Sequence, residues 1–355
     1  MKINRREEVW EVLKGEKPVV VPTIAEAFMD VTVVKQLGFK APDDPIEGRI
    51  ARADFLGNFD VCLGLSPGMK VFKETEEERV YQYETGAVWH ESYEPTFCRE
   101  AIKFPINSPE EAFEFKMPPV HWDEDIPHLV RTFKEKGYFV QGSVPFPWGS
   151  IYYYLTSFDN ILMWMALEEE AAFRIFQLLG AYILECSERL LDAGVDAIFS
   201  GSDLGTGDSL LFSVDMFNKY VVPWIKKIAD LCHQHGAILH FHSHGHIQEV
   251  MDGLIATGVD LLNPVGPSDH NDLKFFKEKW GHKITFLGGI STKIARMSED
   301  EIESHVAQVM EVGCKGSRFM PRTESGIPVM EPDKARFYID TLTRYRRQYG
   351  TSGEK

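Results

Sequence analysis

Four of the chain's twelve histidines stand within seven residues, in the stretch ILHFHSHGH (238–246). Imidazoles gathered at this density serve as metal ligands, proton relays or anion-binding groups. Alternate residues of a strand point to the same side, so His240 and His242 are predicted to share a face, with His244 just past the strand end. His-x-His spacing at a strand end supports metal binding as well as it supports a hydrogen-bonded core histidine.

Short β-branched runs that alternate with longer helical stretches must position these histidines. Eight runs are predicted to be buried strands, and they begin at Val19, Phe59, Tyr138, Val195, Ala237, Val259, Ile284 and Ser317. Eight alternating strand–helix units predict a parallel α/β architecture, a (β/α)8 TIM barrel, rather than an open doubly wound sheet. Residues 79–94 depart from the alternation and predict an antiparallel hairpin insertion after the second strand, turning at Thr85-Gly86. We expect residues 1–355 to form one barrel domain.

Composition excludes several classes of protein. The chain has 355 residues, is 44% hydrophobic and carries a formal net charge of −16, which opposes binding to nucleic acid or to anionic membrane surfaces. The N-terminal stretch lacks the apolar core of a signal peptide, and no apolar run approaches the length that spans a bilayer. The five cysteines form no C-x-x-C motif. These features predict a reduced, cytoplasmic protein.

Active sites of such barrels lie at the carboxyl ends of the strands. The polar residues predicted at those ends are Glu26, Asp203, His242, His244, Asn263 and Glu324. We assign Asp203 as an acid–base group or as a partner that orients a metal-bound histidine, the alternative being a helix cap. Glu26 is assigned as catalytic from its placement, and Asn263 as substrate-binding, with a simple strand end as the alternative.

Aromatic residues follow the third predicted strand. The stretch VPFPWGSIYYYL supplies Phe146, Trp148 and Tyr152, on which a flat aromatic substrate can stack. Trp148 and Tyr152 are four residues apart and therefore share a helix face. Packing of a helix start against the barrel is the competing interpretation. We assign these three residues to substrate binding.

The segment HQHGAILHFHSHGHI resembles a stretch of the uroporphyrinogen decarboxylase superfamily that reads Gly-Ala-x-x-x-x-His-x-Cys-Gly. The segments EVWEVLKGEKPVVVP, SGSDLGTG, FNKYVVPWIKKIADLCHQHGA, TGVDLLNPV and KEKWGHKITFLGGIST also resemble it, in the expected order. The resemblance covers most of the chain and implies a (β/α)8 barrel, in agreement with the strand count.

The superfamily contains two kinds of chemistry. Its decarboxylases carry an Arg-Gln-Ala-Gly-Arg-Tyr motif near the N-terminus, where this chain reads TIAEAFMD and has Glu26 but neither arginine. A substrate with eight carboxylates needs cationic partners. The resemblance therefore favours the other branch, the zinc-dependent methyltransferases that exchange a methyl group with a corrinoid.

Zinc ligands are carried over residue by residue. His242 matches the first ligand, His244 stands where that branch has Cys, and the third position falls near TESGIP, where Glu324 is the candidate. Cys314 precedes the eighth strand and is expected at the other end of the barrel. Two imidazoles and a carboxylate suit zinc. They leave more positive charge on the metal than two thiolates do, which favours polarising an oxygen.

The differences between these candidate ligands and the His, Cys and Cys of the methyltransferase branch imply an aryl methyl ether as methyl donor. The resemblance implies Co(I) of a separate corrinoid-binding protein as acceptor. Three alternatives remain open. The first is a methylcorrinoid:thiol methyltransferase, which the missing cysteines oppose. The second is a metal-free decarboxylase or lyase with His242 and Asp203 as acid–base groups. The third is a non-catalytic binding barrel that holds metal for structure.

Overall fold

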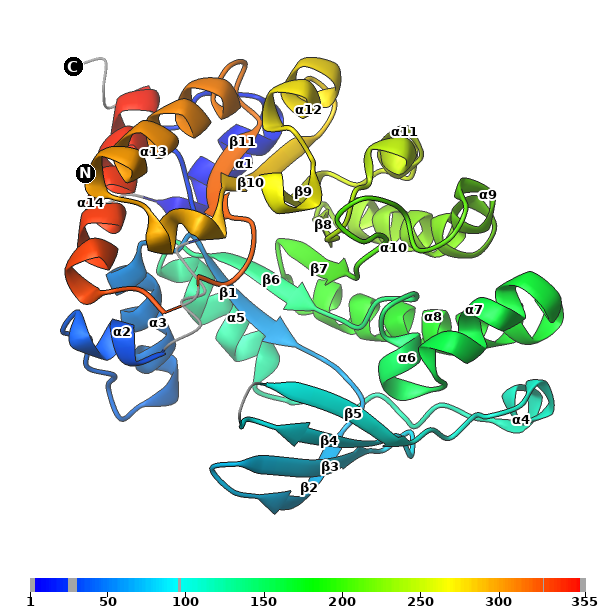
Figure 1. The fold of residues 1–355 in the computed structure, drawn as a ribbon. Coiled ribbons are helices and arrows are strands. Elements are labelled where there is room, and N and C mark those ends of the chain that lie inside the picture. Colours follow the sequence, from blue (N-terminus) through cyan, green and yellow to red (C-terminus); the bar gives the residue numbers. More distant parts are fainter. Residues whose placement is uncertain (1–3, 25–30, 95–96, 328, 352–355) are drawn as a thin grey trace.

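The computed structural model describes residues 4–24, 31–94, 97–327 and 329–351. These residues form two sheets: a parallel one in the order β1-β6-β7-β8-β9-β10-β11 and an antiparallel one in the order β2-β3-β4-β5. Figure 1 shows that the parallel sheet curls, that helices cover its outside, and that the antiparallel sheet lies apart from it. Among the described residues, no helix combines the length and the apolarity needed to cross a bilayer.

The parallel strands are β1 (Asp60–Gly64), β6 (Phe139–Ser143), β7 (Ala197–Gly201), β8 (Ile238–His242), β9 (Leu261–Val265), β10 (Thr285–Ile290) and β11 (Phe319–Thr323). The antiparallel strands are β2 (Met69–Glu74), β3 (Glu78–Tyr83), β4 (Val88–Ser92) and β5 (Cys98–Lys103).

The α-helices are α1 (Arg5–Lys14), α2 (Val31–Gln36), α3 (Pro45–Leu56), α4 (Pro109–Glu114), α5 (Ile126–Glu135), α6 (Ile151–Tyr154), α7 (Phe158–Leu167), α8 (Glu169–Asp192), α9 (Val214–Met216), α10 (Val222–Gln234), α11 (Met251–Ala256), α12 (Leu273–Trp280), α13 (Glu299–Gly313) and α14 (Pro332–Tyr349). Shorter helical segments of other types are η1 (Phe217–Val221), η2 (Gln248–Val250), η3 (Pro267–Asp269) and η4 (Thr292–Arg296).

Seven of the eight predicted parallel strands are confirmed, and the first is corrected. The described residues 18–24 form no strand, because Pro18 and Pro22 have no N–H to give to a ladder. Thr23 nevertheless reaches both edge strands of the sheet. Its carbonyl accepts from the N–H of Phe59, just before β1, at 2.9 Å, and its hydroxyl donates to the carbonyl of Pro321 in β11 at 2.5 Å.

The predicted hairpin insertion is confirmed as β3 and β4, which turn at Thr85-Gly86 with Gly86 at φ +99°. It belongs to a larger unit, since β2 and β5 flank it. These two strands are almost entirely exposed, so they lack the apolar alternation by which a strand is detected. The indole of Trp89 in β4 donates to the carbonyl of Tyr153 at 2.9 Å, which joins the insertion to α6.

Helix α13 illustrates how the sequence builds the outer layer. Ser298 and Glu301 form a capping box at its start, which satisfies backbone N–H groups that the helix leaves unpaired. Its buried residues Ile302, Val306 and Val309 recur every three or four positions, the spacing of one helix face. That face packs against β10 and β11.

The interior of the parallel sheet changes from apolar to polar towards the carboxyl ends of the strands. Its floor is an apolar cluster that includes Val9, Val12, Phe59, Phe139, Ala197, Ile238, Leu261, Leu287 and Met320. Because alternate strand residues share a face, the next inward positions after four of these are Gln141, His240, Asn263 and Arg322. The inward positions after those include His242 and Glu324. The fold therefore places the polar residues at one end.

The buried His240 makes the stability of the protein depend on pH. Burial lowers the pKa of His240 from 6.5 to about 3. The stabilising contribution of the neutral ring is therefore complete above pH 6.5 and is lost progressively as the pH falls from 6.5 towards 3. We expect the wild-type free energy of unfolding to fall between pH 7 and pH 5, with about 2 kcal/mol of the loss due to this residue.

Chemical denaturation at the two pH values measures this contribution. The variant His240→Gln should show the smaller pH-dependent loss, whatever its absolute stability. The matched control is His282→Gln, at an exposed position, which should keep the wild-type pH dependence. Equal losses in all three proteins would show that His240 titrates normally in the folded state.

Candidate active site

The ends of β7 and β8 approach so closely that the site depends on a glycine. Gly201 pairs with His242 in the parallel ladder. A Cβ on Gly201 would lie 2.1 Å from the carbonyl oxygen of His242, closer than atoms can pack. The loops that follow also touch, because a Cβ on Gly245 would lie 2.3 Å from the Cα of Gly205. This contact brings Asp203, from the loop after β7, beside the histidines of β8.

Two imidazoles and two carboxylates gather at this place. The rings of His242 and His244 are 5.1 Å apart between centroids and nearly perpendicular. The Nε2 of His242 lies 3.9 Å from Oδ1 of Asp203, and the same oxygen accepts from the backbone N–H of His244 at 3.1 Å. The Nδ1 of His244 lies 2.8 Å from Oδ2 of Asp269, a residue that sequence reasoning did not single out.

The two histidines have opposite electrostatic environments. Burial, together with the nearby His244, lowers the pKa of His242 from 6.5 to about 3. The hydrogen bond with Asp269 raises the pKa of His244 against the effect of burial. Burial, the largest single effect, raises the pKa of Asp269, but the hydrogen bond and charge of His244 and the N–H of Gly245 together outweigh it, and the net shift is downward. His242 is therefore neutral at physiological pH, with its lone pair available, and His244 is held by a carboxylate.

Imidazole and carboxylate groups are ligands that zinc accepts. Among the described residues, however, no three such side chains are already arranged to bind a metal ion. A carboxylate that holds one ring nitrogen of a histidine, as Asp269 holds Nδ1 of His244, is the usual way to orient a metal-binding imidazole. The Nδ1 of His242 is buried without a hydrogen-bond partner. Besides Asp269, which already holds His244, the carboxylate shown beside the two rings is that of Asp203, 3.9 Å from Nε2 of His242.

The carboxylate of Glu324 makes hydrogen bonds with residues other than the two histidines. Its side chain is 1% exposed, and its carboxylate accepts from the N–H of Ser268 at 2.8 Å, from the hydroxyl of Ser268 at 2.7 Å and from the N–H of Thr292 at 3.1 Å. It thereby ties the loops after β9 and β10 to the end of β11. Its assignment as third zinc ligand stays a proposal, with Asp203 as the competing carboxylate.

The aromatic residues after β6 differ in their exposure. Phe146 and Trp148 are 1% and 0% exposed, and the indole of Trp148 donates to the carbonyl of Asp203 at 3.0 Å. Trp148 therefore supports the loop that carries the acid. The ring of Tyr152 lies 5.9 Å from that of Trp148 and stays partly exposed, so it is the one of the three with a free surface for stacking.

The buried polar layer beneath the site connects four strands. The amide of Gln141 donates to Oδ2 of Asp60 at 2.6 Å, which directs its carbonyl oxygen at Nδ1 of His240, 2.7 Å away. Nδ1 of His240 is therefore the donor, which leaves Nε2 of the neutral ring as an acceptor. Nε2 lies 2.8 Å from Oδ1 of Asn263, and the amide nitrogen of Asn263 is buried without a partner. Turning the Asn263 amide by 180° exchanges these two atoms and gives Nε2 a donor.

The buried polar layer accounts for the positions of His240 and Asn263. His240 is a hydrogen-bonded core histidine, and Asn263, 0% exposed, is its partner. A substrate-binding role for Asn263 stays a prediction. Glu26 lies outside the described residues. Sequence reasoning missed Asp60, Gln141 and Arg322, although the alternation of Met320, Arg322 and Glu324 along β11 could have placed Arg322 on the inner face.

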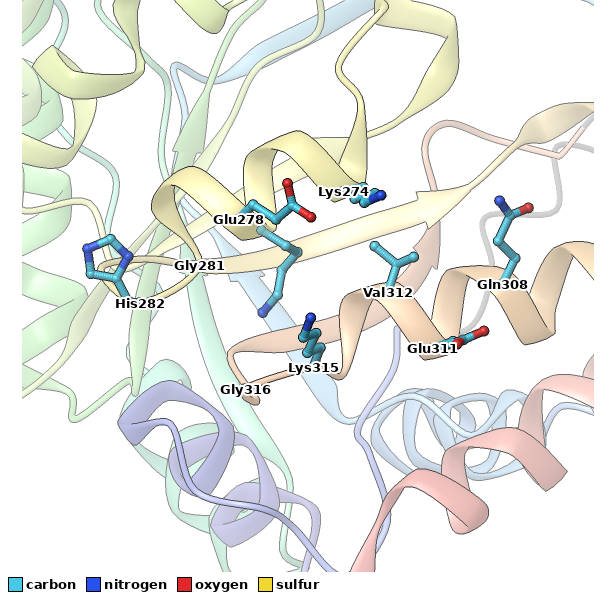
Figure 2. Close-up of a pocket in the computed structure, with 10 residues that line it drawn as sticks. Lys274, Glu278, Gly281, His282, Gln308, Glu311, Val312, Lys315 and Gly316 are labelled. Carbon is cyan, nitrogen blue, oxygen red and sulfur yellow. The ribbon is translucent and has the colours of Figure 1, made fainter.

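A cavity of about 590 Å³ lies elsewhere, between α12 and α13. Figure 2 shows Lys274 and Glu278 on α12 and Glu311 and Val312 on α13, with Lys315 after α13. The loops that complete its lining precede β10 and β11. It therefore opens towards the amino ends of the strands, away from the histidine pair.

Comparison with protein families decides the classification. A family model described as uroporphyrinogen decarboxylase (URO-D) matches residues 124–345, more than half of the chain. The chain belongs to the uroporphyrinogen decarboxylase family. The resemblance found in the sequence is thus confirmed. The URO-D match includes the strands from β6 to β11, and the antiparallel insertion lies outside it.

Two solved structures match this URO-D family member to different degrees. A methyltransferase from Methanosarcina mazei superposes with a TM-score of 0.68 at 14% identity, covering 98% of this chain and 99% of its own. A sugar phosphate isomerase/epimerase from Parabacteroides distasonis matches with a TM-score of 0.37 at 11% identity, covering 92% and 93% of the two chains. The search of curated proteins gives no match. The first likeness shows a shared fold over nearly the whole chain.

The His244–Asp269 pair has a measurable signature. The pKa of His244 is raised by its hydrogen bond to Asp269, whereas the pKa of His242 is about 3. In metal-free protein we expect His244 to protonate above pH 6.5 and His242 to stay neutral down to pH 5. Imidazole chemical shifts from NMR spectra recorded against pH give both values.

The variant Asp269→Asn should lower the pKa of His244, because the amide gives no negative charge to stabilise the imidazolium. Asp208→Asn, at an exposed neighbour of His270, is the matched control and should leave His244 unchanged. A His244 titration unaffected by Asp269→Asn would contradict the pairing.

Proposed function

We propose that this URO-D family chain is a zinc-dependent methyltransferase that moves the methyl group of an aryl methyl ether to Co(I) of a separate corrinoid-binding protein. The observation that carries the proposal is the pair His242 and His244, with His244 oriented by Asp269. The shared fold with a methyltransferase from Methanosarcina mazei supports it. So does TIAEAFMD, where decarboxylases of the family carry two arginines.

The proposed zinc would be held by His242 and His244, with Glu324 as the third ligand that the resemblance implies or Asp203 as the one that the geometry favours. When bound, zinc supplies a Lewis acid beside the ether oxygen, where negative charge develops as the methyl group leaves. We also propose that the segment around Thr23 closes the curled seven-stranded sheet into a TIM-barrel-like fold around this site, because Thr23 bonds to both edges without forming a strand.

The residues of the chain would prepare the substrate. Asp203, whose side chain is 51% exposed, can accept the proton of a phenolic hydroxyl next to the ether. Trp148 holds the Asp203 backbone in place, and Asp269 holds the ring of His244. Tyr152 offers a face for the substrate ring. The methyl–oxygen bond breaks, the electron pair stays on oxygen as phenolate, and the methyl group passes to the cobalt nucleophile on the partner protein.

The metal assignment is tested by zinc content after purification. We expect about one zinc per chain, and a sharp loss in His242→Ala and in His244→Ala, because a site left with two protein ligands binds weakly. Asp203→Asn and Glu324→Gln then identify the carboxylate, since the variant that loses zinc marks the third ligand. Cys314→Ala is the control and should keep its zinc. Full zinc content in His242→Ala would exclude the proposed site.

The donor assignment is tested with methyl ethers and a reduced corrinoid protein in excess. We expect 2-methoxyphenol to react at least roughly ten times faster than methoxybenzene. Its hydroxyl can give up a proton to Asp203 and bring the ether oxygen to the metal, and losing one such electrostatic contact typically costs about 3 kcal/mol. Where Asp203→Asn keeps its zinc, it should reduce the difference between the donors, because the proton acceptor for the hydroxyl is gone.

Two results would overturn the donor assignment. Equal rates for both ethers would remove the proposed role of the hydroxyl. Methylation of a thiol from methylcorrinoid, without demethylation of any aromatic ether, would identify the chain as a methylcorrinoid:thiol methyltransferase instead.

A further inference from the structure

The turn that begins α6 packs against the loop after β7 through a glycine. A Cβ on Gly149 would lie 2.3 Å from Cβ and 2.5 Å from Oγ of Ser202, so only glycine fits there. The same point lies 3.4 Å from the hydroxyl oxygen of Tyr152. The hydroxyls of Ser202 and Tyr152 therefore meet over Gly149. Because Ser202 directly precedes Asp203, this contact brings the Tyr152 hydroxyl to the candidate active site.

The hydroxyl of Ser202 is buried and unsatisfied. The residue is 9% exposed, and its Oγ makes no hydrogen bond with any described residue. A buried hydroxyl without a partner destabilises a structure. The oxygen of Tyr152, over the same glycine, is the acceptor towards which Ser202 can turn its proton.

The surroundings of Tyr152 keep its hydroxyl protonated. Burial raises the pKa of Tyr152 most strongly, and the neighbouring Tyr153 and the carboxylate of Asp203 raise it further. The hydroxyl of Ser202 lowers it only in part, so the net shift is upward. Tyr152 is therefore a phenol at physiological pH and can donate a hydrogen bond. The effect of Asp203 also shows that an acceptor lies within electrostatic range of this donor.

Aromatic neighbours hold the ring of Tyr152 in place. The ring lies edge-to-face with Trp148 at 5.9 Å and with Phe158 at 5.4 Å between centroids, and Tyr153 lies 5.2 Å away. The indole of Trp148 also donates to the carbonyl of Asp203 at 3.0 Å. One tryptophan thus positions both the donor and the acceptor. Groups that are fixed before binding lose little conformational entropy when a ligand arrives.

We infer that the hydroxyl of Tyr152, oriented by Ser202, binds the oxygen of a hydroxyl group on the substrate and directs the proton of that group at Asp203. This inference rests on the proposed function and adds the residues that set its specificity. A phenolic hydroxyl both accepts and donates, so it satisfies Tyr152 and Asp203 together. An ether oxygen at this place can accept from Tyr152 but has no proton for Asp203. Sites built to bind a hydroxyl strongly reject analogues that lack it.

The hydrogen bonds run in one direction. Ser202 donates to the oxygen of Tyr152, and Tyr152 donates to the oxygen of the substrate. Hydrogen bonds in series polarise one another, so the first strengthens the second. Tyr152 is thus the residue that touches the substrate, and Ser202 is a positioning residue that acts through it.

Equilibrium binding tests the inference without methyl transfer. The probes are 2-methoxyphenol and methoxybenzene, which differ only in the hydroxyl, and their affinities are measured by calorimetry on the purified protein. We expect wild type to bind 2-methoxyphenol at least roughly ten times more tightly. Tyr152→Phe keeps the ring and removes the hydroxyl. It should lower the ratio of the two affinities about fivefold, the effect of one neutral hydrogen bond, and leave the affinity for methoxybenzene nearly unchanged.

A double-mutant cycle tests the role of Ser202. Ser202→Ala alone should lower the ratio of affinities about twofold, because Tyr152 loses the hydrogen bond that strengthens it as a donor. The same substitution in the Tyr152→Phe background should have no further effect on the ratio. Equal effects of Ser202→Ala in both backgrounds would show that Ser202 does not act through Tyr152.

The matched control is Tyr154→Phe. Tyr154 lies on the same helix, but its ring contacts Tyr83 of the antiparallel insertion at 4.7 Å, so this variant should keep the wild-type ratio. Circular dichroism and zinc content verify that each variant is intact. A ratio that is unchanged in Tyr152→Phe, or lost equally in Tyr154→Phe, would overturn the inference. So would an equal loss of affinity for both ligands in Tyr152→Phe, which would leave the ring with a packing role alone.

The outcome separates this inference from the proposed function. Demethylation of 2-methoxyphenol by wild type, with a preference for the hydroxyl that does not depend on Tyr152, would overturn the inference alone. Tyr152-dependent binding of 2-methoxyphenol, without demethylation of any aryl ether, would support the hydroxyl site and overturn the methyl-transfer proposal.

Discussion

The organisation of the mouth of the sheet depends on one hydrogen-bonded chain of buried side chains, which runs from Asp60 through Gln141 and His240 to Asn263. Each link fixes the next. The carboxylate of Asp60 sets the amide of Gln141, which sets the tautomer of His240, which sets the amide of Asn263. Polar groups at this depth are tolerated only when they are satisfied in this way. This series of hydrogen bonds therefore forms a rigid, buried polar layer beneath His242, His244 and Asp203.

The difference between the histidines of one short segment follows from depth and partners. His240 is 1% exposed and has a partner for both ring nitrogens, so it is part of the structure. His242, two residues on, is neutral but has a buried nitrogen with no partner. His244 lies beyond the strand, and its hydrogen bond with Asp269 raises its pKa. The three histidines thus differ in role. Only His242 and His244 are available to bind a metal or a substrate.

Sequence patterns predicted most of the parallel sheet because buried parallel strands are continuous apolar runs. They failed where that signal is weak or misleading. The run from Val19 is apolar, but its flanking prolines prevent strand pairing. The strands β2 and β5 are exposed and have no apolar face to detect.

The candidate active site was likewise predicted only in part. The alternation of residues in β8 placed His240 and His242 on one face, and the position of Asp203 after β7 placed it near them. Asp269 follows β9 in a short helical segment that no periodicity marks. Whether Glu324 is free to complete the proposed metal site depends on its hydrogen bonds from Ser268 and Thr292, which lie in loops distant in sequence. Arg322 was missed because an arginine in a strand normally indicates a solvent-facing position.

The contact between Gly201 and His242 also constrains how this site can vary in evolution. Any side chain at position 201 would collide with backbone atoms of residue 242, so glycine is required at 201 whichever side chain stands at 242. A homologous chain in which these two strands approach as closely is expected to keep the glycine even where the histidine has changed. The glycine, although chemically inert, then becomes a marker of this close strand approach in more distant members of the family.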